Sequence, residues 1–175
     1  MIGGLVALCC VGGAIALVAS MSGDDSDTSS DSGTDSAGDN GQDGVALGTP
    51  VRDGKFEFVV SKVECGKSQV GSSALGAQAQ GQFCLATMSI KNIGDQAQTF
   101  DSSSQFAYDA SDRKHSADGA ASLYANQNNE AFINEINPGN QVNAVVVFDV
   151  PKDAQLQRLE LHDSPFSGGV TVKLA

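Results

Sequence analysis

Positive charge is missing from the first 47 residues of this chain, which contain no Lys or Arg. This absence disfavours a cleavable secretory signal, because such signals normally begin with a basic segment. It also removes the Lys and Arg bias from which the orientation of a membrane segment is usually inferred. The whole chain has 10 basic against 21 acidic residues and a formal net charge of -11. Nucleic acid is therefore not an expected partner, because it is bound largely through basic residues that neutralise phosphates.

Motifs that carry out a reaction or hold a metal are also missing. The two histidines, His115 and His162, have no further Cys or His at zinc-ligand spacing, and no Cys-x-x-Cys redox pair occurs. His162, Asp163 and Ser164 have the residue types of a hydrolase triad, but neighbours along a strand point to opposite faces and cannot form that relay. No G-x-S-x-G nucleophile elbow occurs. We therefore expect no catalytic, cofactor-binding or metal-binding residues, and we expect that the chain is not an enzyme.

An uninterrupted apolar run covers residues 2–19, which at about 1.5 Å per residue in a helix is just long enough to span a hydrocarbon core. We expect residues 1–21 to form a single transmembrane helix, as an anchor or an uncleaved signal segment. Two alternatives stay open, namely cleavage near Ala19 and lipid attachment at Cys9 or Cys10. Cleavage would release the protein in secreted form.

The next segment, residues 22–47, is rich in Asp, Ser and Gly, and its seven aspartates account for most of the net charge. From Asp27 to Asp43 they recur at every fourth residue, which in a helix would place like charges at i and i+4 and destabilise it. The segment has too little apolar surface to fold, so we expect a disordered, self-repelling linker. Because this acidic flank is easier to export than to retain, we expect the rest of the chain to be extracellular.

Residues 48–175 have the size of one domain and the pattern of an all-β fold. Short runs alternate apolar and polar residues, and no stretch of ten or more residues shows a helical apolar stripe. The clearest strand begins after the turn Asn137-Pro138-Gly139 and ends at Pro151. Its inward-facing row is expected to consist of Val142, Ala144, Val146, Phe148 and Val150.

Seven to nine short strands are expected in this domain. The stronger ones are residues 55–65 with a bulge near Ser61, 82–92, 141–150, 156–161 and 170–174, and the weaker ones are residues 97–101, 105–109 and 131–135. This number of strands, with no helix and no Trp, predicts two packed antiparallel sheets.

Two cysteines of the domain, Cys65 and Cys84, lie 19 positions apart, one at the end of a predicted strand and the other early in the next. In an oxidising compartment such a pair most simply forms a structural disulfide. Closing a loop of this size would stabilise the fold by about 3 kcal/mol on the chain-entropy model. The enclosed residues 66–82 are mostly Gly, Ser, Gln and Ala, and we expect a loop with little order of its own.

Several pieces of the domain, taken in order, carry a resemblance to a known family. They are VRDGKFEFVVSKV at residues 51–63, GQFCL at 81–85 running into SIKNIGD at 89–95, the turn NPG at 137–139, VFDVP at 147–151, and residues 159–161 with FSGGV at 166–170. Together they resemble the DUF4352 family. The resemblance implies an immunoglobulin-like β-sandwich in an exported bacterial protein, similar to a secreted mycobacterial immunogenic antigen. It supports the pairing of Cys65 with Cys84 and implies no catalytic residues.

One turn departs from the pattern of that family. Between Tyr108 and His115, similar proteins tend to carry a turn glycine where this chain has Asp112, so we expect a less tight hairpin. His115 lies in a polar stretch that we expect to be a solvated hairpin end.

The sequence predicts only a class of function. We expect a membrane-tethered, non-catalytic binding module that presents the loops at residues 66–82 and 123–130 to an envelope component or a host protein. The most binding-like surface is the loop at residues 123–130, because aromatic and amide side chains supply contact area and adaptable hydrogen bonds. Its candidate interaction residues are Tyr124, Asn126, Gln127, Asn128 and Asn129. The alternatives are an exported enzyme with a site assembled from loops, and a secreted or lipoprotein antigen released from the membrane.

Overall fold

The computed structural model describes residues 44–126 and 130–174 of the chain. The predicted anchor, residues 1–21, and the predicted linker as far as residue 43 lie outside these ranges. Among the helices in the described ranges, none is both long and apolar enough to cross a membrane.

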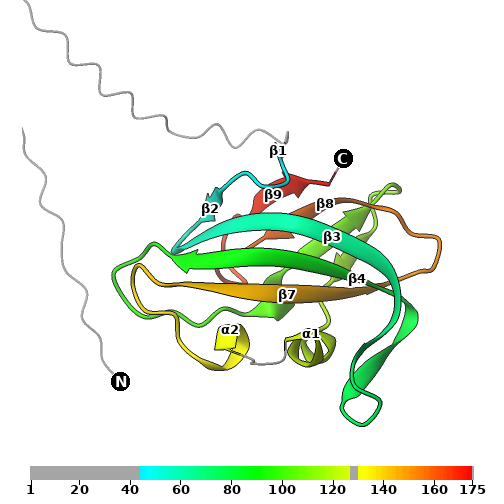
Figure 1. Cartoon of the computed structure of the whole chain (residues 1–175). Coiled ribbons are helices and arrows are strands. Elements are labelled where there is room, and N and C mark those ends of the chain that lie inside the picture. The colour runs from blue at the N-terminus through cyan, green and yellow to red at the C-terminus, as the bar shows by residue number, and fades with distance from the viewer. Residues whose placement is uncertain (1–43, 127–129, 175) are drawn as a thin grey trace, which may run out of the picture. The chain divides into compact units, whose positions relative to one another are not determined.

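Two β-sheets form the domain (Figure 1). The four-stranded sheet has the order β2-β3-β4-β7, and the five-stranded sheet has the order β1-β9-β8-β5-β6. The strands are β1 (Val45–Ala46), β2 (Val51–Asp53), β3 (Phe56–Gly71), β4 (Gly76–Asn92), β5 (Phe106–Asp109), β6 (Lys114–Ser116), β7 (Gln141–Val150), β8 (Leu156–Leu161) and β9 (Val170–Lys173). Neighbouring strands pair antiparallel, except that β1 lies parallel to β9. The predicted all-β sandwich is confirmed, and its first strand precedes Gly48.

The main core lies between the two sheets. The predicted inward row of β7 is confirmed, because Val142 is partly buried and Ala144, Val146, Phe148 and Val150 are buried. Three phenylalanines, Phe56, Phe58 and Phe100, pack with ring centroids 5.9 to 6.2 Å apart. Burial of these large apolar side chains is the main source of stability.

The hairpin of β3 and β4 continues beyond the predicted strand ends to a turn at residues 72–75. The prediction of a poorly ordered loop at residues 66–82 is therefore wrong, and we call this segment the outer hairpin. Bulges interrupt the pairing near Ser61, as predicted, and at two places between Glu64 and Gln69. Because bulges bend and twist a strand, the outer hairpin curls toward helix α1 (Gly119–Ala125) (Figure 1).

A second, smaller core lies on the outer face of the four-stranded sheet. Phe83 of β4 and Val147 of β7 point away from the main core and are buried by Val70 of the outer hairpin and Ala121 of α1. This double burial explains why the sequence of β4 is apolar on both faces in its first half.

Short helices join the strands, so the prediction of a domain without helices is wrong. They are α1, α2 (Glu130–Ile133) and one turn of 3-10 helix at Ser102–Ser104. Residues 131–135 and 97–101 do not form the strands predicted there. The carboxylate of Asp118 caps α1 by accepting a hydrogen bond from the N–H of Ala121 at 2.9 Å. Helices of seven and four residues are too short to show an apolar stripe in sequence.

Candidate functional site

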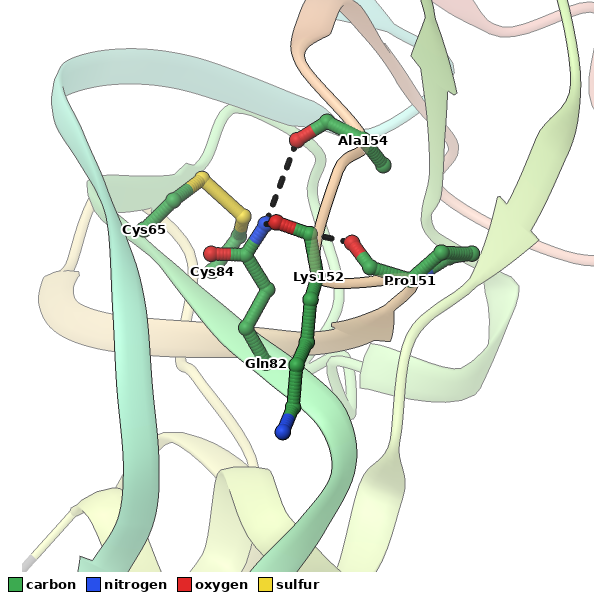
Figure 2. Close-up of a disulfide and its surroundings, with 6 residues drawn as sticks. All are labelled: Cys65, Gln82, Cys84, Pro151, Lys152 and Ala154. Atoms are coloured by element: carbon green, nitrogen blue, oxygen red, sulfur yellow. Dashed lines mark hydrogen bonds between the residues drawn. A yellow bond between two sulfur atoms is a disulfide. The ribbon is translucent and has the colours of Figure 1, made fainter.

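A disulfide between Cys65 and Cys84 joins the strands at the base of the outer hairpin (Figure 2). Cys84 on β4 is buried, whereas Cys65 on β3 is exposed. The bond lies where a bulge interrupts the regular pairing between Glu64 and Lys67. The disulfide that the sequence predicts is therefore present, and it fixes the place where the outer hairpin leaves the sheet.

Polar contacts hold the outer hairpin against the end of β7. The carboxylate of Asp149 accepts hydrogen bonds from the backbone N–H groups of Gln80 and Gly81, at 2.7 and 3.0 Å. The side-chain amide of Gln82 lies 3.0 to 3.2 Å from three carbonyl oxygens, those of Pro151, Lys152 and Ala154 (Figure 2). The outer hairpin thus has a fixed position beside α1.

A groove of about 600 Å³ lies between the outer hairpin and α1, and we call it the hairpin groove. This volume is within the usual range of small-molecule sites. The lining residues are Lys67, Gln69, Val70, Gly71, Ser72, Leu75, Leu85, Tyr124, Ala125 and Val145.

Apolar side chains make much of the lining of the hairpin groove. Leu85, Ala125 and Val145 are partly buried and pack against the second core. Val70 is buried, but Leu75 at the turn of the outer hairpin is 70% exposed. The groove therefore continues the second core outward as apolar surface that a ligand can cover.

Two polar groups of the hairpin groove form no close ion pair or hydrogen bond with a residue that the structure describes. Lys67 is the one charged residue in the lining. It forms no close ion pair or hydrogen bond with another described residue, although its charge helps to lower the pKa of the Glu64 carboxyl. The hydroxyl of Tyr124 likewise has no hydrogen-bond partner among the described residues. In contrast, the Gln69 side chain accepts a hydrogen bond from Gln78 at 2.9 Å. Lys67 and Tyr124 are therefore the groups of the lining that are available to a ligand.

The candidate interaction residues at the end of helix α1 point in different directions. Tyr124 lines the hairpin groove, but Asn126 turns toward β7 and exchanges two hydrogen bonds with the backbone of Val145, at 2.8 and 2.9 Å. Ser122 Oγ accepts a hydrogen bond from the N–H of Val147 at 2.9 Å. These bonds satisfy the edge of β7 in place of another strand. The remaining candidates, Gln127, Asn128 and Asn129, lie outside the described residues.

Sequence reasoning named residues 66–82 as a binding loop without singling out Lys67 or Leu75, and it missed Leu85 and Val145. The signal for the outer hairpin was the alternation of Ala and Gln at residues 77–80, because a period of two is typical of a strand. No sequence signal places α1 beside this hairpin.

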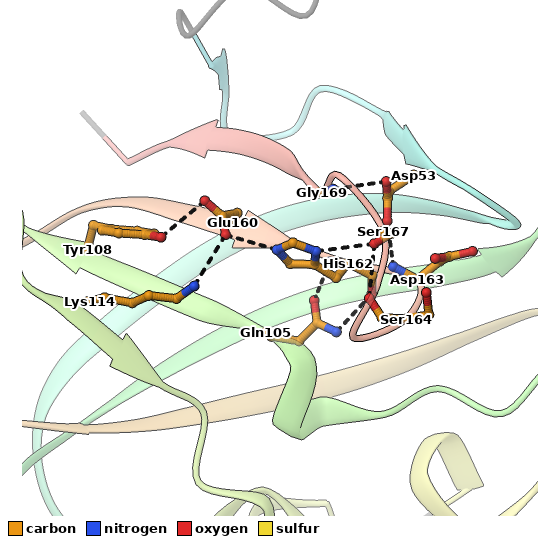
Figure 3. A network of polar contacts seen from close by, with 10 residues as sticks. All are labelled: Asp53, Gln105, Tyr108, Lys114, Glu160, His162, Asp163, Ser164, Ser167 and Gly169. Carbon is orange, nitrogen blue, oxygen red and sulfur yellow. Dashed lines mark hydrogen bonds and ion pairs between the residues drawn. The ribbon is translucent and has the colours of Figure 1, made fainter.

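The second notable cluster surrounds His162 on the outer face of the five-stranded sheet (Figure 3). Its Nε2 atom lies 2.9 Å from Glu160 Oε1, and its Nδ1 atom lies 3.1 Å from Ser167 Oγ. The ring of Phe106 packs edge-on against the imidazole, with the centroids 5.5 Å apart. The backbone of Gly169 covers the imidazole so closely that a Cβ atom there would lie 2.5 Å from it. His162 therefore contacts Ser167 and Glu160, and not Asp163 and Ser164, the adjacent residues considered from sequence.

The loop that covers His162, residues 163–169, is tied to both sheets (Figure 3). Asp53 of β2 accepts a hydrogen bond from the N–H of Asp163 at 2.7 Å. The side-chain amide of Gln105 exchanges two hydrogen bonds with the backbone of His162, both of 2.9 Å. With both ring nitrogens of His162 engaged and the residue only 8% exposed, this network closes one end of the sandwich.

Hydrogen bonding determines the charge state of Glu160. Burial raises the pKa of its carboxyl, but hydrogen bonds from His162 and Tyr108, with the nearby Lys114, lower the pKa by more. The pKa of Glu160 therefore lies below its ordinary value, and the carboxylate stays ionised within the network.

The hairpin end is exposed at Arg113, Lys114 and Ser116, as expected, but His115 itself pairs with a buried carboxylate. Its Nε2 atom lies 3.0 Å from Asp109 Oδ2, and its side chain is 13% exposed. Burial raises the pKa of Asp109, but hydrogen bonds from His115, Arg113 and the backbone lower it well below its ordinary value. Across residues 44–126 and 130–174, no group of three or more His, Cys, Asp or Glu residues is placed to hold a metal ion.

Comparisons with known proteins give a family and a fold. The family model described as "Domain of unknown function (DUF4352)" matches residues 45–172. The crystal structure of the yjhA protein from Bacillus subtilis is similar with a TM-score of 0.54 and 16% identity, covering 75% of this chain and 99% of that chain. The secreted protein MPT63 from Mycobacterium tuberculosis is similar with a TM-score of 0.51 and 14% identity, covering 74% of this chain and 97% of that chain. Among curated proteins, none matches the chain.

Both solved structures consist almost entirely of the matched fold. A sandwich of this kind therefore folds without a further domain in those proteins. In this chain both hydrophobic cores and the disulfide also lie within the compact unit Gly38–Ala175. We conclude that this unit has what it needs to fold on its own.

Proposed function

Because the chain belongs to the DUF4352 family, whose function is unknown, we propose a function from its geometry: a non-catalytic binding module that works outside the cell. The hairpin groove is its binding surface. The observation that supports this proposal is an apolar lining with two polar side chains, Lys67 and Tyr124, that form no close ion pair or hydrogen bond with a described residue.

The state of the two histidines supports a non-catalytic role. His162 holds a serine and a carboxylate, but Phe106 and Gly169 cover its ring, so no substrate has a path to it. His115 is held by Asp109 at 3.0 Å in a largely buried pair. Catalytic acids and bases must reach the proton that they transfer, and these side chains are occupied within the fold.

Three observations support a location outside the cell. The Cys65–Cys84 disulfide is typical of proteins in oxidising compartments. The apolar run at residues 2–19 followed by an acidic segment predicts a membrane anchor and a spacer. The structural neighbour MPT63 is a secreted protein. We propose a single-pass anchor with the sandwich on the outer side, and a partner in the cell envelope or on a host.

Blocking the groove tests this function. The compact unit Gly38–Ala175 would be incubated with an envelope extract of the cells that express it, repurified and examined by native mass spectrometry. We expect a retained component that is lost in the variant Ala125→Phe, which fills the groove, and kept in the control Ala110→Phe, an equal enlargement at an exposed turn. Equal retention by both folded variants would contradict the proposal, as would turnover of a component of the extract.

A further inference from the structure

The chemistry of the hairpin groove narrows the class of ligand that it takes. The groove combines an apolar lining from Val70, Leu85 and Val145 with one positive charge, that of Lys67. No acidic side chain lines the groove, and Glu64, whose pKa Lys67 helps to lower, lies outside the lining and is bonded to Lys62 at 2.7 Å. An apolar surface with one cation is complementary to a molecule that is apolar along its length and carries an anionic group.

Peptide ligands are disfavoured at β7, because the edge of this strand beside the groove offers no free backbone groups. A peptide in an apolar groove must satisfy its own N–H and C=O groups, usually by adding a strand to a sheet edge. The edge of β7 next to the groove is already occupied, since Asn126 bonds to both backbone groups of Val145 and Ser122 bonds to Val147. At the turn of the outer hairpin, the N–H of Ser72 donates to the carbonyl oxygen of Leu75 at 2.8 Å. An alkyl chain has no such groups to satisfy.

We propose that the hairpin groove binds a single-chain amphiphile, an alkyl chain that ends in a carboxylate or a phosphate. The alkyl chain lies along Leu85, Val145 and Val70, and the anionic group is held by Lys67. The hydroxyl of Tyr124 donates a further hydrogen bond to the anionic group. This inference rests on the proposed function and names its ligand class.

Calorimetric titration of the compact unit Gly38–Ala175 with three probes tests the inference. The probes are dodecanoate and dodecyl phosphate, each below its critical micelle concentration, and dodecanol below its solubility limit. We expect both anions to bind about tenfold more tightly than the alcohol, because a charge-assisted hydrogen bond contributes roughly that factor. The anion that binds more tightly shows whether the natural ligand ends in a carboxylate or in a phosphate. Methyl NMR shifts should centre on Leu85 and Val145, which line the groove.

Two exposed lysines provide the matched variants. Lys67→Gln should weaken binding of both anions about tenfold and leave dodecanol unchanged, because only the anions use the charge. Lys55→Gln should change nothing, because Lys55 does not line the groove. Both side chains are exposed, so neither substitution should prevent folding.

Three results would overturn the inference. They are equal binding of dodecanol and the anions, methyl shifts centred away from the groove, and tighter binding of an acetylated Leu-Val-Leu peptide than of dodecanoate. If the envelope component is retained and Ala125→Phe releases it, but no alkyl anion binds, the ligand class is wrong and the proposed function stands. If Ala125→Phe releases nothing from the extract, the proposed function itself fails.

Discussion

Asp112 adopts the left-handed backbone conformation, with φ of 60°, in the turn between β5 and β6. Among the residues that the structure describes, it is the one non-glycine residue with positive φ. Asp tolerates this conformation better than most residues because its short side chain can hydrogen-bond locally. Its carboxylate also forms an ion pair of 2.6 Å with Arg158, but the Asp112 side chain is 76% exposed and such pairs contribute little. The turn therefore closes without a glycine at this position.

Two substitutions of Asp112 separate the cost of its positive φ from the contribution of its ion pair with Arg158 to stability. We predict that Asp112→Ala has a free energy of unfolding about 1 kcal/mol lower than Asp112→Gly, because alanine pays the steric cost of positive φ and glycine does not. Both variants lose the Arg158 pair equally, so each is the control for the other. Urea denaturation at neutral pH measures the difference, and equal stabilities would contradict the assignment of strain to this turn.

The carboxylates of Asp109 and Glu160 make stability depend on pH. Both have a pKa below the ordinary value in the folded state, so their contribution is present above the pKa of the unfolded chain and is lost as the pH falls. We predict that Asp109→Asn is less stable at pH 7 and loses less stability between pH 5 and pH 3 than the wild type. Melting temperatures across this range measure the slope.

The control for this pH dependence is Asp153→Asn, which removes an exposed carboxylate that bonds to no other described residue. It should leave the acid slope unchanged. An unchanged slope in Asp109→Asn as well would show that the bonds from His115 and Arg113 do not control the acid stability.

Helix α1 acts as an element that closes the edge of a sheet. Without it, the backbone groups of β7 at Val145 and Val147 would be open for pairing with another chain. Ser122 and Asn126 occupy these groups from one side of the helix, four residues apart. The same helix presents Tyr124 to the hairpin groove. One short helix therefore both protects the sheet and builds part of the candidate site.

Removing one edge contact tests this role of α1. We predict that Asn126→Ala lowers the free energy of unfolding by about 1–2 kcal/mol, because the N–H and C=O of Val145 lose their partner. Tyr124→Phe on the same helix is the control, since its hydroxyl has no described partner, and should change stability by less than about 0.5 kcal/mol. Equal effects in thermal or urea unfolding would argue against edge closure by Asn126.

The elements that the sequence predicts well are those with a regular pattern over enough residues. Alternation in β7 and the turn at Gly139, with φ of 79°, were both predicted and are both present. Helix α1 was missed because seven residues cover less than two full turns and only Ala121 and Ser122 are buried. The outer hairpin was missed because Ala and Gln carry little strand propensity, so composition outweighed their alternation.

The candidate site could be predicted only in part. Tyr124 was identified from its residue type, and it lines the groove, whereas Asn126 beside it has a structural role. The segment 66–82 was named as a binding loop, but Lys67 itself was not singled out, because its place in the lining depends on how the hairpin lies beside Leu85 and Val145. The contact of Ser167 with His162 depends on a loop that folds back over its own strand, which no local pattern encodes.

At the scale of the whole molecule, apolar, acidic and folded segments follow one another along the chain. The apolar run comes first, the seven aspartates come next, and the family match begins at residue 45. A flexible linker of this length has an end-to-end distance of about 25–30 Å, and more when charged. We therefore predict that the linker separates the sandwich from the outer surface of the membrane that holds the anchor. In that location the disulfide can form and the hairpin groove can reach envelope components.

Protease treatment of intact cells that express the full chain tests this placement most directly. Proteinase K is suitable because it does not require Lys or Arg, which are missing from the first 47 residues. We predict that the sandwich is cut away from intact cells as readily as from lysed cells, while a cytoplasmic control protein is digested only after lysis. Protection of the sandwich until lysis would contradict the extracellular location and, with it, the proposed binding function.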